Sequence, residues 1–168
     1  MNIEREEYKY FINQIDYMFL RSCLKSLMKL DINSKKNNKY TITSLYLDTF
    51  NLDDFTEKLE GIKDRKKYRL RIYNRNYELI KFEKKLKNNF VINKKSYTIN
   101  KNIAKKICSG DYSEFKKKEN PIFIQKIYAD LISNCYLPKV IVEYEREAYL
   151  LKNHNIRITF DSKLRTFN

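Results

Sequence analysis

The sequence predicts an α+β fold with a largely antiparallel sheet. Segments in which residue types alternate with a period of two recur along the chain, and short turns join most of them as consecutive hairpins. Fewer segments place apolar residues at the three- and four-residue spacing of an amphipathic helix. Together these patterns predict about seven strands and roughly three or four helices in one domain over residues 1–168, without an internal repeat.

Each predicted strand has its own signal in chain order. The first alternates charged and aromatic residues, the second is the β-branched and aromatic run YTITSLYLD, and the third, KYRLRIY, alternates cleanly. The fourth follows a short turn as a hairpin, the fifth follows Asn88 and Asn89, and the last two are KVIVEYEREAY and NIRITFD. The predicted ranges are Glu4–Ile12, Tyr40–Asp48, Lys67–Tyr73, Glu78–Leu86, Val91–Tyr97, Lys139–Tyr149 and Asn155–Asp161.

The helices are predicted from caps and apolar stripes. Asn13–Leu30 has Asp16 as its expected cap, and Asn51–Leu59 is a short helix that ends before a glycine turn. Lys101–Ser109 and Pro121–Asn134 are the remaining helices. The first helix has the apolar stripe Ile15, Phe19, Leu20, Cys23, Leu24 and Leu27, and the last has Ile124, Ile127, Tyr128, Leu131 and Ile132.

Composition excludes several classes of protein. With 42% hydrophobic and 14% aromatic residues, the chain can bury a core despite its 33% of charged residues. Two glycines are too few for a glycine-rich phosphate loop, no apolar run reaches roughly 18 residues, and the charged N-terminus has no signal-peptide core. Three cysteines and one histidine, His154 in an expected solvated loop, disfavour a disulfide framework or a zinc site and favour a cytoplasmic location.

The net charge of +14 predicts an anionic partner, unless the charge is only a solvated coat. In a chain rich in lysine, five of the nine arginines lie at alternating strand positions. A guanidinium donates two parallel hydrogen bonds to phosphate oxygens, which favours a polyanion as that partner. The charged faces are Arg5/Glu7/Lys9, Arg69/Arg71, Lys81/Glu83/Lys85, Tyr144/Arg146 and Arg157/Thr159/Asp161.

Two arrangements of the sheet fit these charged faces. One is an ordinary open sheet with a solvated side. The other is a closed barrel with a polar lumen, which needs an inward basic face and an outward polar face. The row Glu143, Glu145 and Glu147 favours the barrel, because we expect these carboxylates on the opposite face to meet solvent.

Seven motifs follow one another along the chain: REEYKYFI (Arg5–Ile12), SLYLDT (Ser44–Thr49), KLxG (Lys58–Gly61), RKKYRLRIY (Arg65–Tyr73), FEKK (Phe82–Lys85), PKVIVEYEREAY (Pro138–Tyr149) and IRITFD (Ile156–Asp161). In this order and spacing they resemble the VTC domain, the polyphosphate polymerase domain of the vacuolar transporter chaperone complex, in its bacterial form. That family lies in the triphosphate tunnel metalloenzyme superfamily, beside CYTH-type triphosphatases. The resemblance spans Ile3 to the end of the chain.

The resemblance implies an antiparallel β-barrel of the triphosphate tunnel, CYTH-like type, with flanking helices. In the family a further segment follows IRITFD and supplies a helix, a closing strand with an acidic metal ligand, and a terminal lysine. This chain ends at Asn168 without a counterpart. We therefore expect residues 1–168 to form a VTC-like domain that lacks its C-terminal closing segment, with an unpaired sheet edge.

Carried over by position, the resemblance implies three groups of site residues. Arg5 replaces the first acidic residue of the superfamily's Glu-x-Glu-x-Lys strand. The two carboxylates below have an alternative role as salt-bridge partners that space the basic residues. The catalytic phosphate clamps are Arg69, Arg71, Lys85, Arg146 and Arg157; further phosphate ligands are Arg5, Lys9, Lys81 and Lys94 or Lys95; ligands of Mg²⁺ or Mn²⁺ are Glu7 and Glu83.

The function implied by the resemblance is transfer of the γ-phosphate of a nucleoside triphosphate to a polyphosphate chain. Such a reaction depends mostly on positioning and on charge neutralisation. Two alternatives remain open: a triphosphatase with the same tunnel, and a non-catalytic polyanion-binding module. Nucleic acid is the weaker polyanion, because the basic strands show few aromatic platforms for bases, although Tyr73 and Tyr144 keep it open.

Overall fold

The computed structural model describes residues 6–31, 34, 38–89, 91–151 and 154–167. Arg5 and the start of the predicted first strand therefore lie outside the described residues. The elements are α1 (Gln14–Leu27), β1 (Lys29–Leu30), β2 (Tyr40–Asp48), α2 (Asp53–Leu59), β3 (Arg65–Tyr73), β4 (Ile80–Asn88), β5 (Val91–Ile99), α3 (Lys101–Cys108), the 3₁₀ turn η1 (Ser113–Lys116), α4 (Ile122–Ser133), β6 (Leu137–Leu151) and β7 (Ile156–Phe167).

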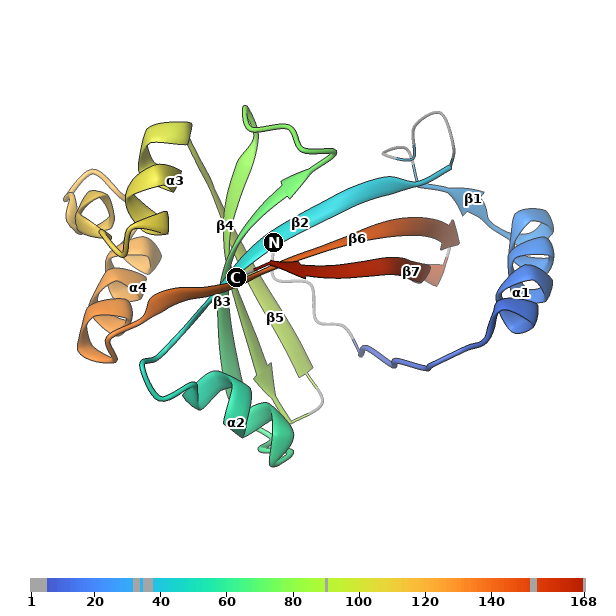
Figure 1. Ribbon diagram of the computed structural model, residues 1–168, viewed down its shortest axis with the longest axis horizontal. Coiled ribbons are helices and arrows are strands. Elements are labelled where there is room, and N and C mark those ends of the chain that lie inside the picture. The colour runs from blue at the N-terminus through green and yellow to red at the C-terminus, as the bar shows by residue number, and fades with distance from the viewer. Residues whose placement is uncertain (1–5, 32–33, 35–37, 90, 152–153, 168) are drawn as a thin grey trace.

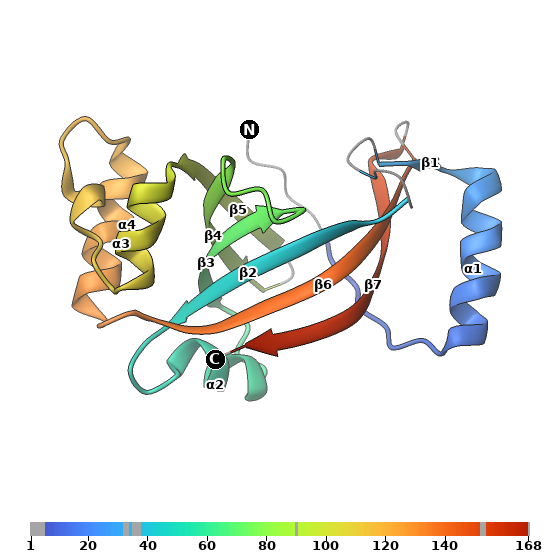
Figure 2. The ribbon, with the colours of Figure 1, turned by 45° about the horizontal axis from the view of Figure 1, so that its top comes forward.

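The strands of the described residues form one curled antiparallel sheet (Figures 1 and 2). The order is β1-β6-β2-β3-β4-β5, and β7 pairs along the other side of β6. Within the described residues β5 and β7 each pair on one side, so the sheet is open at both edges. This arrangement agrees with the predicted α+β antiparallel class, and β2 has the predicted range Tyr40–Asp48.

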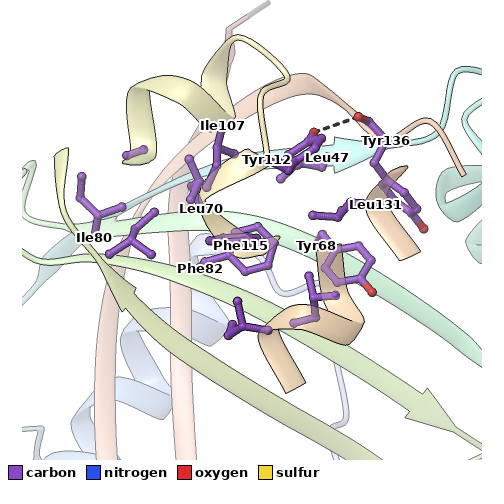
Figure 3. Packing of buried hydrophobic residues seen from close by; sticks show 14 residues of the cluster. Leu47, Tyr68, Leu70, Ile80, Phe82, Ile107, Tyr112, Phe115, Leu131 and Tyr136 are labelled. Carbon is purple, nitrogen blue, oxygen red and sulfur yellow. Dashed lines mark hydrogen bonds between the residues drawn. The ribbon is translucent and has the colours of Figure 1, made fainter. Parts of the chain in front are cut away.

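Helices cover the outer face of the sheet at its two ends (Figure 2). At one end α3, η1 and α4 pack on β3 and β4, where alternation turns Tyr68, Leu70 and Phe82 outward (Figure 3). Aromatic rings interlock edge to face in this core: Phe82 and Phe115 have ring centroids 4.9 Å apart, and those of Tyr68 and Tyr136 are 5.1 Å apart. Burial of each such side chain stabilises the fold by about 1.5–3 kcal/mol.

The other end has a smaller core under α1. Leu24, Tyr149 and Phe160 form it, and Glu147 is fully buried beside them. Arg21 Nε lies 2.8 Å from Glu147 Oε1, and the hydroxyls of two tyrosines also donate to this carboxylate. The expectation that the glutamate row of β6 meets solvent is therefore wrong for Glu147, because α1 brings a cation and hydroxyl donors over it.

Glu143 in the same row is also buried, against expectation. Arg75 and the Thr43 hydroxyl bond to its carboxylate, so Arg75 covers it from outside the sheet. Long-range cation partners of this kind are not visible in a strand's own alternation. Glu145 stays half-buried and pairs with Lys163.

The N-terminal region departs most from the prediction. Of the strand predicted over Glu4–Ile12, the described part from Glu6 onward is irregular and exposed, and within the described residues no strand lies against it to complete a ladder. The next helix begins one residue later than predicted, with Asn13 rather than Asp16 as its cap. Of its predicted apolar stripe only Leu24 is buried, because α1 turns Tyr17 and Arg21 toward the sheet.

Two remaining features bear on the predicted organisation. His154 is exposed, as expected for a loop residue. No helix within the described residues is long and apolar enough to cross a membrane.

Candidate anion-binding site

The inner face of the curled sheet is the side away from α3 and α4, and strand register gathers the predicted basic residues on it. Arg69 on β3 lies opposite Glu83 on β4, which in turn lies opposite Ser96 on β5. Two residues further along β3, Arg71 lies opposite Lys81. Because residues two apart share a face, these side chains all point away from the aromatic core.

Two arginines converge on one buried carboxylate at the centre of this face. Arg69 Nη2 lies 2.7 Å from Glu83 Oε2, and Arg71 Nη1 lies 3.7 Å from the same oxygen. The Glu83 side chain is fully buried, and burial alone would raise its pKa. The two arginines and Lys94 outweigh burial and hold the pKa of Glu83 at about 2, so the carboxylate is ionised at neutral pH.

Neutral hydroxyls complete the surroundings of the arginine pair. Arg69 Nη1 donates to the Tyr46 hydroxyl at 3.2 Å, and Arg71 Nε donates to Ser44 Oγ at 3.1 Å. Burial raises the pKa of Tyr46, but Arg69 outweighs it and leaves the pKa below its ordinary value. The guanidinium groups are thus held in fixed orientations by β2, which is the preorganisation that phosphate recognition requires.

A row of three lysines crosses the sheet beside the arginines. Lys67, Lys85 and Lys94 lie directly opposite one another on β3, β4 and β5. Lys94 Nζ lies 3.3 Å from Glu83, whereas Lys85 Nζ lies 2.5 Å from Glu7 Oε2 of the N-terminal segment. Within the described residues no ion pair forms at Lys67. Burial, with Lys58 and Arg65 adding repulsion, lowers the pKa of Lys67.

The remaining two predicted arginines line the inner face of β6 and β7. Arg146 makes a bidentate contact with Asp161, at 2.6 and 2.7 Å, and its guanidinium lies over the Tyr144 ring. Burial lowers the pKa of Arg146, but the hydrogen bond to Asp161 outweighs it and raises the pKa above its ordinary value. Arg157 Nη2 donates to Asp31 and to the Tyr40 hydroxyl, each at 2.7 Å.

Not every predicted site residue joins this group. Lys95 lies over the Phe123 ring of α4 on the outer side, so the structure places Lys94 rather than Lys95 with Glu83. Lys9 is exposed on the N-terminal segment, where it lies 3.8 Å from Glu7. Lys81 lies on the inner face with its ammonium over the Tyr73 ring. Arg5 lies outside the described residues.

Sequence reasoning missed several members of the site. Ser44 and Tyr46 are neutral and give no signal in a charge pattern. Asp31 lies between the first predicted helix and the second predicted strand, outside any predicted element. Lys67, by contrast, shares the period-two face of the arginines within its own predicted strand, so alternation could have found it. Asp161 lies on the face that alternation predicts for it, but its pairing with Arg146 depends on the register between β6 and β7.

The two predicted metal ligands do not fit a preformed metal site. Oε2 of Glu83 lies within ion-pair distance of both arginines, and Oε1 accepts from Lys94 and Ser96, which leaves no free carboxylate edge. Glu7 pairs with two lysines. The described residues contain no group of three or more potential ligands. Both carboxylates here act as the counterions of basic residues.

The described residues thus form an α+β fold with a curled antiparallel sheet, helices outside it and clustered cationic side chains on its inner face. The chain matches the VTC domain family over residues 4–168, nearly its whole length. It therefore belongs to the VTC domain family.

Solved structures share the fold at low sequence identity. A Bacillus halodurans protein, described as a candidate adenylate cyclase, is 14% identical with a TM-score of 0.60, over 97% of this chain and 74% of that chain. A Hippeastrum protein, described as a candidate adenylyl cyclase with a dominant triphosphatase activity, is 15% identical with a TM-score of 0.55, over 96% and 72%. No curated protein matches the chain.

Proposed function

We propose that the inner face binds the phosphates of a nucleoside triphosphate and of a polyphosphate chain, and that it transfers the γ-phosphate to the end of that chain. The observation that carries this proposal is the pair Arg69 and Arg71. Both guanidinium groups are held on one buried, ionised carboxylate, Glu83, in the middle of a face where cations outnumber carboxylates. Membership of the VTC domain family supports the same substrate class.

The chemistry asks the protein for position and charge rather than for a nucleophile. A terminal oxygen of the polyphosphate attacks the γ-phosphorus and forms a new P–O–P bond. The bond between the γ-phosphorus and the β–γ bridging oxygen breaks, and the nucleoside diphosphate leaves with that oxygen. Negative charge spreads over the transferred oxygens. Arg69 and Arg71 of β3 would clamp that group, while Arg146 of β6 and Arg157 of β7 would hold neighbouring phosphates.

A triphosphatase is the second candidate, in which water takes the place of the polyphosphate oxygen. The Hippeastrum neighbour with its dominant triphosphatase activity favours this alternative. The same arginines would bind the triphosphate in both reactions. Only the acceptor differs, so the products separate the two.

The test is to incubate the purified protein with ATP and to analyse products for ADP, orthophosphate and polymer. It is run with Mn²⁺, with Mg²⁺ and with EDTA, because the family resemblance implies a divalent ion. Polymer with ADP supports transfer, orthophosphate without polymer supports hydrolysis, and binding without turnover supports a non-catalytic module. Activity that survives Arg69→Ala combined with Arg71→Ala would rule out the assigned site.

A matched control keeps that result interpretable. Lys66 and Lys84 lie on the outer face, where both pair with Asp130 of α4. The double variant Lys66→Ala with Lys84→Ala removes two positive charges, as the arginine double variant does, but takes them from the outer face of β3 and β4. It is expected to retain activity while its folding is checked by circular dichroism.

A further inference from the structure

Glu7 makes a contact that the proposed function does not use. Its carboxylate reaches the inner face of the sheet from the N-terminal segment, residues 6–12, and lies 2.5 Å from Lys85 Nζ. Burial raises the pKa of Glu7, but Lys85 outweighs it, with Lys9 and Arg146 adding, and the pKa falls below its ordinary value. Glu7 therefore stays ionised within the electrostatic reach of three predicted phosphate ligands, Lys85, Lys9 and Arg146.

The N-terminal segment has few other attachments. Figure 1 draws it as a thin blue line without an arrow, leading from α1 toward the middle of the molecule. Within the described residues its side chains make two hydrogen bonds, one local between Tyr8 and Glu6 and one to Lys85. Tyr8, Tyr10 and Phe11 are exposed. One ion pair thus ties a segment that lacks both a ladder and a core contact.

The carboxylate of Glu7 lies at a row of lysines on the inner face, where an anion reduces the repulsion between neighbouring positive charges. Lys67, Lys85 and Lys94 stand side by side across three strands, and like charges directly opposite one another are destabilising. Glu83 forms an ion pair with Lys94, and Glu7 forms one with Lys85. Within the described residues Lys67 forms no ion pair. These two carboxylates compensate the row of three lysines only in part, because Glu83 is shared with Arg69 and Arg71, whereas several adjacent phosphates would compensate it fully.

We infer that Glu7 is a built-in competitor for the phosphate site: inorganic tripolyphosphate or the end of a polyphosphate chain displaces its carboxylate from the lysine row and releases residues 6–12. This inference rests on the proposed binding of polyphosphate at the inner face. It replaces the expected metal-ligand role of Glu7, with which the lysine pairing disagrees. The segment then regulates access to the site, because each incoming anion must first break the ion pair of Lys85.

Calorimetric titration with tripolyphosphate in EDTA tests this directly, using wild type, Glu7→Gln and Glu6→Gln. Glu6 is the matched control, because it is exposed, lies in the same segment and contacts Tyr8 rather than the sheet. Glu7→Gln is expected to bind at least about threefold more tightly than wild type, the size of a partly exposed ion pair. Glu6→Gln is expected to stay within about twofold, although it changes the net charge equally.

Nuclear magnetic relaxation supplies a second measurement on the unaltered chain. Backbone amides of residues 6–12 in the wild type are expected to have lower order parameters when tripolyphosphate is added than in sodium chloride of equal ionic strength, because loss of the Lys85 contact frees the segment. Unchanged or higher order parameters would overturn the inference, as would Glu7→Gln binding no more tightly than Glu6→Gln. A metal-ligand role predicts the opposite pattern, with Glu7→Gln weaker in Mn²⁺ and unchanged in EDTA.

The inference and the proposed function fail in different ways. If the wild type binds tripolyphosphate and Glu7→Gln gains nothing over its control, only the inference is overturned. If all three proteins fail to bind tripolyphosphate, the phosphate site itself is overturned, and the inference falls with it.

Discussion

The two faces of β3 and β4 belong to the same two strands but carry different side chains: the outer face is mainly apolar and aromatic, and the inner face is charged. Outward, Tyr68 and Phe82 pack into an aromatic core under α3 and α4 (Figure 3). Inward, Arg69 and Arg71 surround the buried carboxylate of Glu83. The outer face stabilises the sheet through apolar burial, whereas a buried ion pair is weak evidence for stability because desolvation offsets its attraction. Stability alone therefore does not account for the buried charge of the inner face, which is the face that we propose binds phosphates.

Buried carboxylates repeat this contrast on a smaller scale. Glu83 has both oxygens engaged by donors, and its pKa falls to about 2. Asp54 lies on the other side at the start of α2, where Tyr136 donates to Oδ1 and no described group donates to Oδ2. Burial raises the pKa of Asp54 to about 6 despite that hydrogen bond. Both carboxylates are buried, so the strength of compensation by neighbouring cations decides whether the pKa falls, as at Glu83, or rises, as at Asp54.

The largest expected effect comes from breaking the apolar face. Phe82→Ala removes a ring that contacts Tyr68 and Phe115, and we expect it to lower the free energy of unfolding by about 3–5 kcal/mol. Urea denaturation followed by circular dichroism measures this. Leu79→Ala, at a half-exposed position just before β4, is expected to change stability by less than about 1 kcal/mol. Equal losses in the two variants would contradict the assignment of the core.

The second prediction concerns acid and the inner face. Because the folded-state pKa of Glu83 lies below its ordinary value of 4.5, its contribution is fully present above pH 4.5 and is lost as pH falls toward about 2. That shift corresponds to about 3 kcal/mol. Glu83→Gln should therefore be less stable than wild type at pH 7, with a gap that narrows below pH 4.5. Denaturant titrations across this range give the gap, and a constant difference would argue against an ionised Glu83.

The third prediction concerns Asp54, whose removal is expected to stabilise the protein at neutral pH, by less than the loss of Glu83 destabilises it. The folded-state pKa of Asp54 is raised from 3.8 to about 6, so stability falls as pH rises between these values and stays lower above them. Asp54→Asn keeps an acceptor for Tyr136 and removes the buried charge. We expect it to raise the free energy of unfolding by about 1–2 kcal/mol at pH 7.5 and to have little effect near pH 4. Thermal melts at both pH values check this, and destabilisation at pH 7.5 would contradict it.

The sequence predicted the inner face of β3 and β4 well because alternation is a local property. The period-two pattern alone places Arg69 with Arg71 and sets Glu83 on the facing strand. The same pattern failed at Glu147, where burial depends on Arg21 of a helix far away in the chain. A local pattern shows which residues share a face, but not what the rest of the fold brings to cover that face.

The N-terminal segment illustrates a second limit. Its alternation is as regular as that of β3, yet a strand also needs a neighbour that satisfies its backbone, and none lies against residues 6–12 in the described sheet. Partners of the site arginines were missed for a related reason. Tyr46 carries no charge, and Asp31 lies in a loop whose approach to Arg157 depends on β1 pairing with β6.

The most direct test compares one arginine on each face of the sheet. Arg146 on the inner face pairs with Asp161, and Arg75 on the outer side pairs with Glu143, so Arg146→Gln and Arg75→Gln remove the same charge from the same kind of ion pair. Tripolyphosphate affinity is measured for both by calorimetry. We predict that Arg146→Gln loses about tenfold, equivalent to about 1.4 kcal/mol, while Arg75→Gln stays within about twofold. Equal losses would mean that net charge rather than the inner face binds the anion, and would contradict the account.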